Sequence, residues 1–463
     1  MQRVAESDLQ LQHYVDTEAD RIVASLFEWL RIPSISAQPD HADDVRRSAE
    51  FTAQLMRDAG LEHVEILETA GAASVYSDHL HAGPDAPTAL VYGHHDVQPV
   101  DPLDQWRSPP FEPVIVDGEC RARGAIDDKG QMLYEIEAVR GLLQRDGRLP
   151  VNVKFIVEGE EEVGSPHFED LLWRKREKLS CDVVVASDTG MWSRTVPSTT
   201  LGMRGNVCFD VTVRTSSIDL HSGSFGGAVP NAAHVIASIV AGLHDADGRI
   251  TVPGFYDDVR PLTDEEAAAF AALPLDEEAW KRNAGVKRLE GEKGYGLLER
   301  IWTRPTCDVV GIGVGYTGAG IKTIIPAQGD VKVTFRLVPD QKPATIADAF
   351  EAWLGEQVPD GIDVSVRREG EGVAASLTPA DDPAVGALCR AIARVWEKEP
   401  LFTREGGSGP EEALGRVLHA PVLFLGVGLP GDRFHAPNER IVMDQFWKGL
   451  LAAGELWTEL SRG

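Results

Sequence analysis

The sequence predicts an α/β protein in which helices flank a mainly parallel sheet and a smaller α+β domain is inserted. Four short apolar runs, each followed directly by polar residues, are typical of strands buried on both faces. These runs span residues 89–92, 151–157, 183–186 and 422–427. Apolar residues at helical spacing over 11–30 and 129–144 predict flanking helices, and alternation of strands with helices indicates a parallel sheet.

A different pattern begins near residue 207, where apolar and polar residues alternate as in an antiparallel strand with one exposed face. The elements expected after this strand are a helix near 231–243, strands near 309–315 and 331–338, a helix near 346–354 and a strand near 362–367. Their order predicts a βαββαβ sandwich.

The α/β pattern returns near Asp381, so the second domain is expected to be inserted into the first. We expect a discontinuous catalytic domain over 1–206 and 379–463, with the inserted domain over 207–378. Charged insertions within 253–300 are expected on loops and surface helices, and the sequence does not indicate their role.

The composition excludes several classes of protein. A chain of 463 residues is too long for one ordinary domain, and a net charge of -28 repels nucleic acid. The first ten residues lack the apolar core of a signal peptide, and no apolar run is long enough to span a bilayer. Five scattered cysteines argue against a disulfide framework. We therefore expect a cytoplasmic protein with neither a nucleic-acid nor a membrane partner.

The polar residues that follow the apolar runs are rich in carboxylates and imidazoles. They are His94, Asp96, Asp127, Asp128, Glu160, Glu161, Glu162, Asp188 and His435. Because functional groups gather at the carboxyl ends of the strands in open α/β sheets, these side chains are expected to converge. Zinc accepts such a mixture of nitrogen and oxygen donors, and manganese and cobalt tolerate it.

Simpler interpretations remain open for each part of this set. Asp127 and Asp128 could cap the helix that follows them. Residues 160–162 could be a solvated acidic loop, although three adjacent carboxylates repel one another unless cations offset their charge. The glycine-rich segment 404–410 could be a flexible turn or an anion-binding loop of backbone amides.

At these residues the sequence resembles the cocatalytic zinc peptidases, a family that includes cytosolic dipeptidase, carnosinase, aminoacylase and bacterial glutamate carboxypeptidase. The similarity is greatest to the dipeptidase and carnosinase branch. Eight ordered strings carry the resemblance, among them Gly-His-His-Asp-Val-Gln-Pro at 93–99, Asp-Leu-His-Ser-Gly at 219–223 and His-Ala-Pro-Asn-Glu at 435–439. The others lie at 123–130, 161–165, 187–188, 336–339 and 404–408.

The resemblance implies two divalent metal ions, with zinc expected and manganese or cobalt as alternatives. Asp127 would bridge them, and the remaining ligands would be His94 and Asp188 at one site and Glu162 and His435 at the other. The implied catalytic residues are Glu161 as general base, Asp96 as the group that orients or tunes the site, and His221 near the developing oxyanion. His95 is assigned no ligand role.

The resemblance also implies how substrate is held. Arg336 and the loop containing Arg404, Gly407 and Ser408 match the parts of the family that bind a substrate carboxylate. The simpler interpretations are a surface ion pair for Arg336 and a structural role for His221. The inserted domain would act as a lid and as the surface of a homodimer.

The function expected from these features is hydrolysis of the amide bond of dipeptides or short peptides with a free carboxy end. Metal-activated water would attack, and Glu161 would accept its proton. One alternative is a deacylase of N-acyl or N-carbamoyl amino acids. Another is a catalytically silent binding protein on the same fold. Such a protein should lack one of the metal ligands or the general base, whereas all of these residues are present here.

Overall fold

The computed structural model describes residues 9–462, and residues 1–8 and 463 lie outside the described part. The prediction that the first ten residues contain no signal-peptide core falls largely on residues outside the described part. Two compact units are present. The first contains residues up to 201 with 377–403 and 410 onward, and the second contains 202–376 with 404–409. The chain passes between them within strands β8 (Ser198–Met203), β15 (Ser376–Leu377) and β16 (Leu401–Glu405).

The first unit is built on a six-stranded sheet of order β1-β2-β6-β3-β7-β17. Its strands are β1 (Glu62–Leu67), β2 (Ser74–His79), β3 (Thr88–His94), β6 (Asn152–Glu158), β7 (Val183–Ala186) and β17 (Val422–Phe424). Strands β6, β3, β7 and β17 are parallel to one another, whereas β2 is antiparallel to both β1 and β6. The predicted mainly parallel sheet is confirmed.

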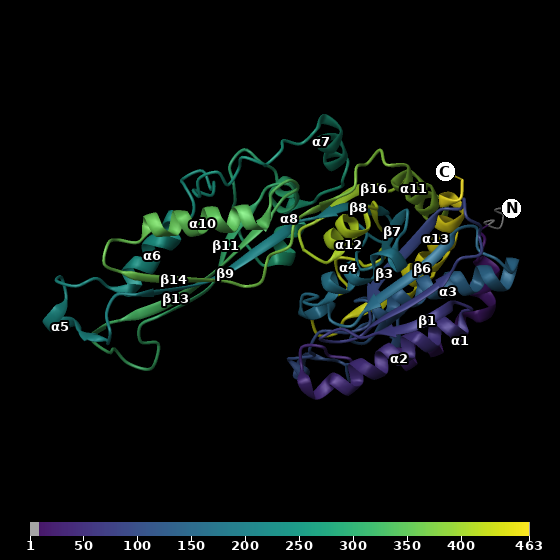
Figure 1. The fold of residues 1–463 in the computed structure, drawn as a ribbon, viewed down its shortest axis with the longest axis horizontal. Helices are drawn as coiled ribbons and strands as arrows, with labels where there is room; N and C mark the ends of the chain where they lie inside the picture. The colour runs from purple at the N-terminus through teal and green to yellow at the C-terminus, as the bar shows by residue number, and fades with distance from the viewer. Residues whose placement is uncertain (1–8, 463) are drawn as a thin grey trace. The chain divides into compact units, whose positions relative to one another are not determined.

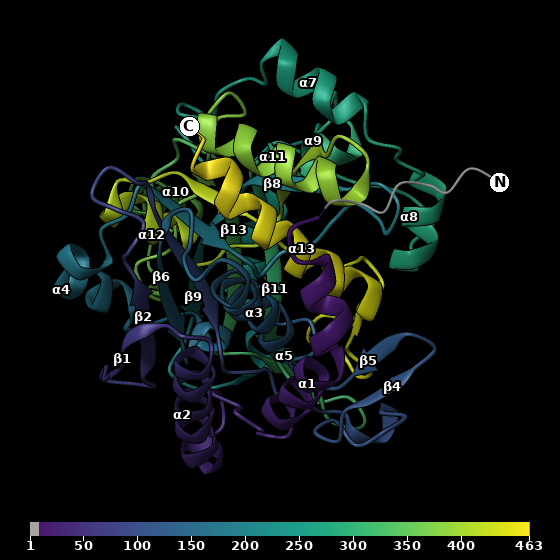
Figure 2. The same cartoon turned by 90° about the vertical axis from the view of Figure 1, so that its right-hand side faces the viewer.

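Helices cover both faces of this sheet (Figures 1 and 2). One face carries α1 (Gln12–Leu30), α2 (Ala42–Asp58), α3 (Lys129–Asp146), α11 (Pro383–Trp396) and α13 (Met443–Leu460). The other carries α4 (Phe168–Leu179) and α12 (Glu411–Leu418). Every residue of β6 and β7 is buried, which explains why these strands lack an alternating pattern.

Strand β17 is shorter than the apolar run that predicted it. The run extends to residue 427, but the strand ends at Phe424. A Cβ on Gly426 would lie 2.2 Å from the carbonyl oxygen of Thr189, so the backbone approaches the β7 loop closely there. Three further strands, β4 (Val114–Val116), β5 (Glu119–Arg121) and β18 (Arg440–Val442), form a separate sheet in this unit.

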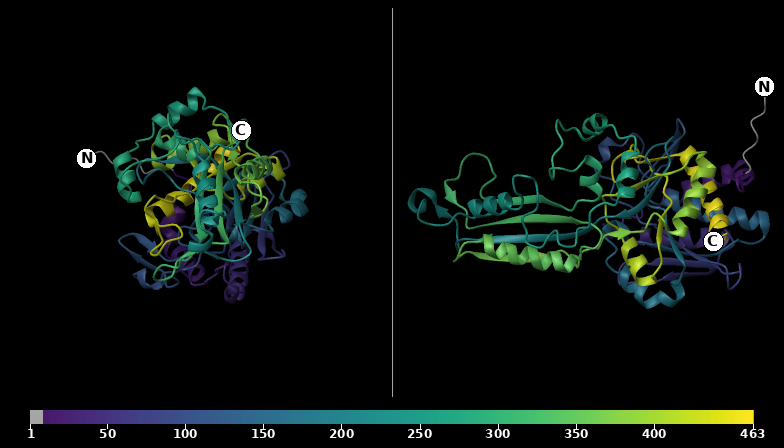
Figure 3. Two further views of the ribbon diagram at one scale, coloured as in Figure 1. Left: turned by 90° about the vertical axis from the view of Figure 1, so that its left-hand side faces the viewer. Right: turned by 90° about the horizontal axis from the view of Figure 1, so that it is seen from above.

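The second unit contains the predicted βαββαβ arrangement, with a four-stranded antiparallel sheet of order β11-β13-β9-β14 (Figure 3). Its elements are β9 (Gly205–Arg214), α6 (Ala232–Gly242), β11 (Thr306–Val314), β13 (Gln328–Leu337), α10 (Pro343–Gln357) and β14 (Asp363–Arg368). Alternate residues of β9 are buried, and α6 and α10 pack on that buried face. The inserted α+β fold is confirmed.

The charged insertions form short helices, as expected. These are α7 (Asp264–Ala271), α8 (Glu277–Ala284) and α9 (Leu297–Trp302). Thr263 and Glu266 make a capping box that begins α7. The remaining small elements are β10 (Leu220–His221), α5 (Ser222–Phe225), β12 (Ile324–Ile325) and single helical turns at Pro39–His41, Leu103–Gln105 and Glu161–Val163.

Within residues 9–462, no helix combines the length and apolar character needed to cross a membrane. All five cysteines are free, and two of them, Cys120 and Cys307, are buried.

The core of the second unit depends on Phe350, which is fully buried and whose ring centroid lies 4.5 Å from that of Phe209 and 5.1 Å from that of Phe335. Phe350→Ala should lower the free energy of unfolding by about 3–5 kcal/mol, because a cavity replaces the ring. Urea denaturation measures this loss. Glu356→Ala, at an exposed position of the same helix, should change the free energy of unfolding by less than about 0.5 kcal/mol. An equal loss in the two variants would show that the Phe350 ring does not stabilise the core.

Candidate metal centre

The predicted ligands come from the ends of neighbouring strands in the first unit. His94 is the last residue of β3, and Asp188 follows β7 by two residues. Glu161 and Glu162 follow β6, in a single turn of 3-10 helix. Asp127 stands two residues before α3 begins. Parallel pairing of β6, β3 and β7 brings these strand ends to one edge of the sheet.

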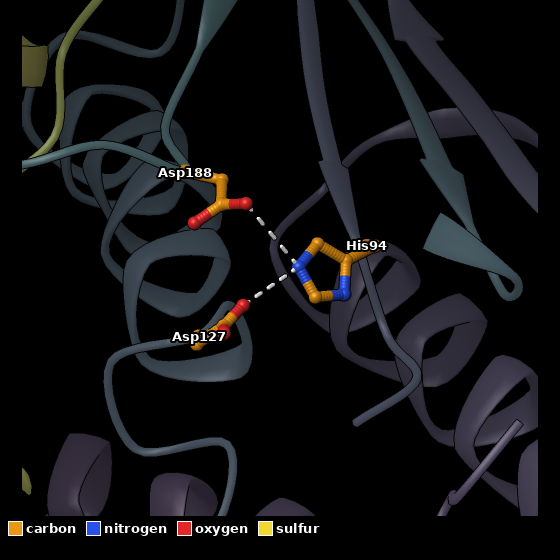
Figure 4. Close-up of side chains that lie close together, drawn as sticks. All are labelled: His94, Asp127 and Asp188. Atoms are coloured by element: carbon orange, nitrogen blue, oxygen red, sulfur yellow. Dashed lines mark hydrogen bonds and ion pairs between the residues drawn. The ribbon is translucent and has the colours of Figure 1, made fainter. Parts of the chain in front are cut away.

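Two groups of donor atoms meet at Asp127. On one side, His94 Nε2 lies 3.1 Å from Asp127 Oδ1 and 3.6 Å from Asp188 Oδ2 (Figure 4). On the other side, His435 Nε2 lies 3.0 Å from Asp127 Oδ2 and 3.2 Å from Glu162 Oε2. Within each group, the donor atoms all lie within 4.8 Å of one another. Each oxygen of the Asp127 carboxylate therefore faces a different imidazole.

Hydrogen bonds to the surrounding carboxylates raise the pKa of both histidines. Hydrogen bonds to Asp127 and Glu162 raise the pKa of His435 to about 11. Burial alone would lower the pKa of His94, but its hydrogen bonds to Asp127, Asp188 and Asp96 raise it well above the usual value. Each imidazole thus lies between carboxylates, at a position where a divalent cation could bind. Mixed imidazole and carboxylate donors suit such an ion.

Asp96 lies behind the ligands rather than among them. Its Oδ1 is 3.3 Å from His94 Nδ1, the ring nitrogen that faces away from Asp127. Its two oxygens also accept from the backbone N–H of Glu161 at 3.3 Å and of Glu162 at 3.1 Å. Asp96 therefore orients an imidazole and the turn that carries the two glutamates, the arrangement by which carboxylates commonly fix metal-binding histidines.

The three adjacent glutamates have separate environments. Glu160 accepts from the backbone of Ala72 at 3.0 Å and pairs with His167 at 2.9 Å, outside the donor groups. Glu162 belongs to the donor groups, and Gln98 Nε2 donates to its Oε2 at 2.8 Å. Burial raises the pKa of Glu161 well above its usual value, and nearby Asp188 adds to the shift. A carboxyl with a raised pKa is suited to accept a proton during catalysis.

Asp128 and His95 support this centre without joining it. Asp128 makes no capping hydrogen bond to α3, so the capping interpretation is wrong for its side chain. Its Oδ2 accepts instead from Ser187 Oγ at 3.1 Å and from the backbone N–H of His94 at 3.3 Å. His95 is fully buried, and burial lowers its pKa to about 4. Its Nε2 lies 3.0 Å from the carbonyl oxygen of Ala73, and His95 belongs to neither donor group.

Glu439 is a supporting residue that the sequence did not reveal. It is fully buried, and Arg123 Nη1 donates to its Oε2 at 2.6 Å. It also accepts from the backbone N–H of Gly124 and Ile126 at 3.0 Å and of Asp127 at 3.2 Å. Its carboxylate therefore fixes the loop that presents Asp127. The residue ends the 435–439 string, but nothing in that string indicates which backbone it binds.

The expected carboxylate-binding residues lie in the second unit, together with His221. Arg336, on β13, donates to Ser408 Oγ at 2.9 Å. Arg204, which the sequence did not single out, donates through Nε to the carbonyl oxygen of Gly406 at 3.1 Å, and its buried Nη1 has no partner among the described residues. Burial, with Arg336 nearby, lowers the pKa of Arg204 to about 10. His221 is exposed and accepts from Gly223 N–H at 3.0 Å.

Arg404 and Gly407 already have partners within the chain. Arg404 is buried and forms an ion pair with Glu266 of α7. The backbone N–H groups of Gly406 and Gly407 donate to Glu405 Oε1 at 2.7 and 3.2 Å. The loop amides thus hold a carboxylate of the chain itself. Arg336 and Ser408, by contrast, have each other as partners.

A parallel sheet that carries two histidine and carboxylate groups around one shared aspartate is the arrangement of a metal-dependent hydrolase. Residues 90–459 match the model of peptidase family M20/M25/M40. The chain belongs to this family, whose members are metallopeptidases, so the expected enzyme class is confirmed.

Individual relatives cover nearly the whole chain. The human Beta-Ala-His dipeptidase is 31% identical, over 97% of this chain and 92% of its own length. The Schizosaccharomyces pombe Cys-Gly metallodipeptidase dug1 is 30% identical, over 95% and 96%. A crystal structure of the M20 family metallo-carboxypeptidase Sso-CP2 from Sulfolobus solfataricus superposes with a TM-score of 0.86, at 32% identity, covering 96% of this chain and 100% of that one. The predicted dipeptidase branch is confirmed.

Glu439→Ala should lower the free energy of unfolding by roughly 3–5 kcal/mol, because it leaves the guanidinium of Arg123 buried and unpaired. Chemical denaturation measures the loss. Glu112→Ala, at an exposed position of the same unit, should cost less than about 0.5 kcal/mol. A similarly small cost for Glu439→Ala would show that this carboxylate does not hold the Asp127 loop.

Proposed function

We propose that this chain is a dipeptidase that uses two divalent metal ions, zinc by expectation, to hydrolyse the amide bond of dipeptides or short peptides with a free carboxy end. The observation that carries the proposal is the Asp127 carboxylate, whose two oxygens lie 3.1 and 3.0 Å from different histidines. The relatives named Beta-Ala-His dipeptidase and Cys-Gly metallodipeptidase support the substrate class.

The donor sets define which residues would hold the ions. His94, Asp127 and Asp188 would bind one, and Asp127, Glu162 and His435 the other. Manganese or cobalt would fit the same donors, because mixed imidazole and carboxylate sites do not select strongly among these metals. When bound, the ions supply Lewis acidity that polarises the scissile carbonyl and lowers the pKa of the attacking water.

The chain's own residues would move the protons. Glu161 would accept a proton from the attacking water and deliver it to the nitrogen of the leaving amine, which its raised pKa favours. Asp96 would keep the His94 ring in place and hold the backbone of Glu161. Through the backbone hydrogen bonds that it accepts, Glu439 would hold Asp127 in position.

The second unit would bind and enclose the substrate. Arg336 and Ser408 would hold the substrate carboxylate, with Arg204 adding positive charge beside them. His221 would stabilise the developing oxyanion. The second unit would also form the surface of a homodimer. It would act as the lid of a catalytic domain that consists of residues 1–206 and 379–463. We also propose a cytoplasmic location, which the five free cysteines support.

Removal of metal tests the proposal directly. Enzyme stripped with a chelator should lose dipeptide hydrolysis, and zinc or manganese should restore it, because three of the five proposed ligands are carboxylates that the ions must hold together. A panel of dipeptides and acetylated amino acids, assayed before and after restoration, measures this. Preference for the acetylated compounds would instead identify a deacylase, and restored metal without turnover of either would favour a silent protein.

Glu161→Gln should retain both metal ions yet lower kcat by roughly 10²- to 10⁴-fold, because glutamine cannot accept the proton. Steady-state kinetics and metal analysis of the same preparation provide the measurement. The matched control is Glu160→Gln, the neighbouring glutamate that pairs with His167 instead, which should keep most of the activity. Near wild-type turnover in Glu161→Gln would rule out its role as general base.

A further inference from the structure

Glu411 is a buried carboxyl group that the proposed mechanism does not use. It is the first residue of α12 and only 3% exposed. Its Oε2 has no hydrogen-bond partner among residues 9–462, and the side chain accepts from its own backbone N–H. Buried polar groups nearly always have partners, and the unpaired oxygen of Glu411 is free to accept a hydrogen bond from a bound molecule.

The position of Glu411 relates it to the metal centre. Helix α12 packs on β7 and β17, and β7 leads directly to Asp188. The charged groups that act on Glu411 are Asp188 and His94, both in the first donor group, and Glu411 in turn acts on Tyr92, two residues before His94 on β3. Glu411 therefore lies on the His94 and Asp188 side of the centre, within the same unit.

Within residues 9–462, no lysine or arginine forms an ion pair with this carboxyl. Burial raises the pKa of Glu411 to about 7, and neither a lysine nor an arginine is among the groups that chiefly shift it. Two other buried glutamates of this unit have an arginine partner, Glu439 with Arg123 and Glu137 with Arg21. Glu135 has none, but only burial shifts its pKa, whereas the pKa of Glu411 also responds to Asp188 and His94. A buried carboxylate beside a reaction centre and without a cation is suited to receive a positively charged ligand group.

We propose that Glu411 binds the free amino group of the substrate and so restricts the enzyme to peptides with an unblocked amino end. The inference rests on the proposed dipeptidase function and sharpens it. An ammonium group offers three donors and a full positive charge, so it would satisfy the unpaired oxygen by a charge-assisted hydrogen bond. An N-acyl or N-carbamoyl group is neutral and would leave the carboxylate buried without a counter-charge, which disfavours such compounds.

The test compares three forms of the metal-loaded, full-length enzyme on one well-cleaved dipeptide and on its N-acetyl derivative. Glu411→Gln should lower kcat/KM for the free dipeptide by roughly 10- to 100-fold, mainly through KM, and leave the acetylated compound unchanged. The matched control is Glu135→Gln, because Glu135 is equally buried, both of its oxygens lack partners, and only burial shifts its pKa. It should keep the wild-type preference for the free dipeptide.

A second measurement needs no variant, in case Glu411→Gln folds poorly. The desamino analogue of the same dipeptide, which lacks only the amino group, should bind the wild-type enzyme roughly 10- to 100-fold more weakly than the dipeptide. Equal binding of the two, or an unchanged preference in folded Glu411→Gln, would overturn the assignment of Glu411 while leaving dipeptide hydrolysis intact. A wild-type enzyme that cleaves no dipeptide would overturn the proposed function itself.

Discussion

The carboxylate of Asp127 is the point on which the arrangement of the first unit depends, since each of its oxygens faces the imidazole of a different histidine. Such a shared carboxylate must be held in position on both sides. Glu439 accepts hydrogen bonds from the loop before it, and α3 begins just after it. The parallel strands then bring His94 and Asp188 to the same edge of the sheet.

Acidic groups that are buried close together repel one another, and the surrounding residues offset this repulsion in different ways. Arg123 neutralises Glu439, and His167 pairs with Glu160. Asp96 binds an imidazole and two backbone N–H groups. The donor groups around Asp127 contain three carboxylates but only two imidazoles, which is why they favour divalent cations.

The two units contribute different chemistry. The first supplies metal ligands and the proposed base, whereas the second carries a pair of guanidinium groups, Arg204 and Arg336, beside Ser408. A dipeptide with free ends carries a carboxylate, which suits guanidinium groups, and an ammonium group, which suits an acidic side chain. The proposed role of Glu411 completes this description, because it assigns an acidic partner to the amino end.

The sequence by itself determined the strands, the helices, the inserted domain and the candidate ligands, because burial patterns and residue order along the chain are local properties. Composition and burial patterns alone did not separate Glu160 from Glu162, and only the family resemblance distinguished these two residues, which have different partners. Nor could the sequence show that Glu266 pairs with Arg404, that Glu439 binds the Asp127 loop, or that Glu411 is buried without a cation. Only the tertiary structure decided these points, because each depends on which distant segments packing brings within hydrogen-bond distance.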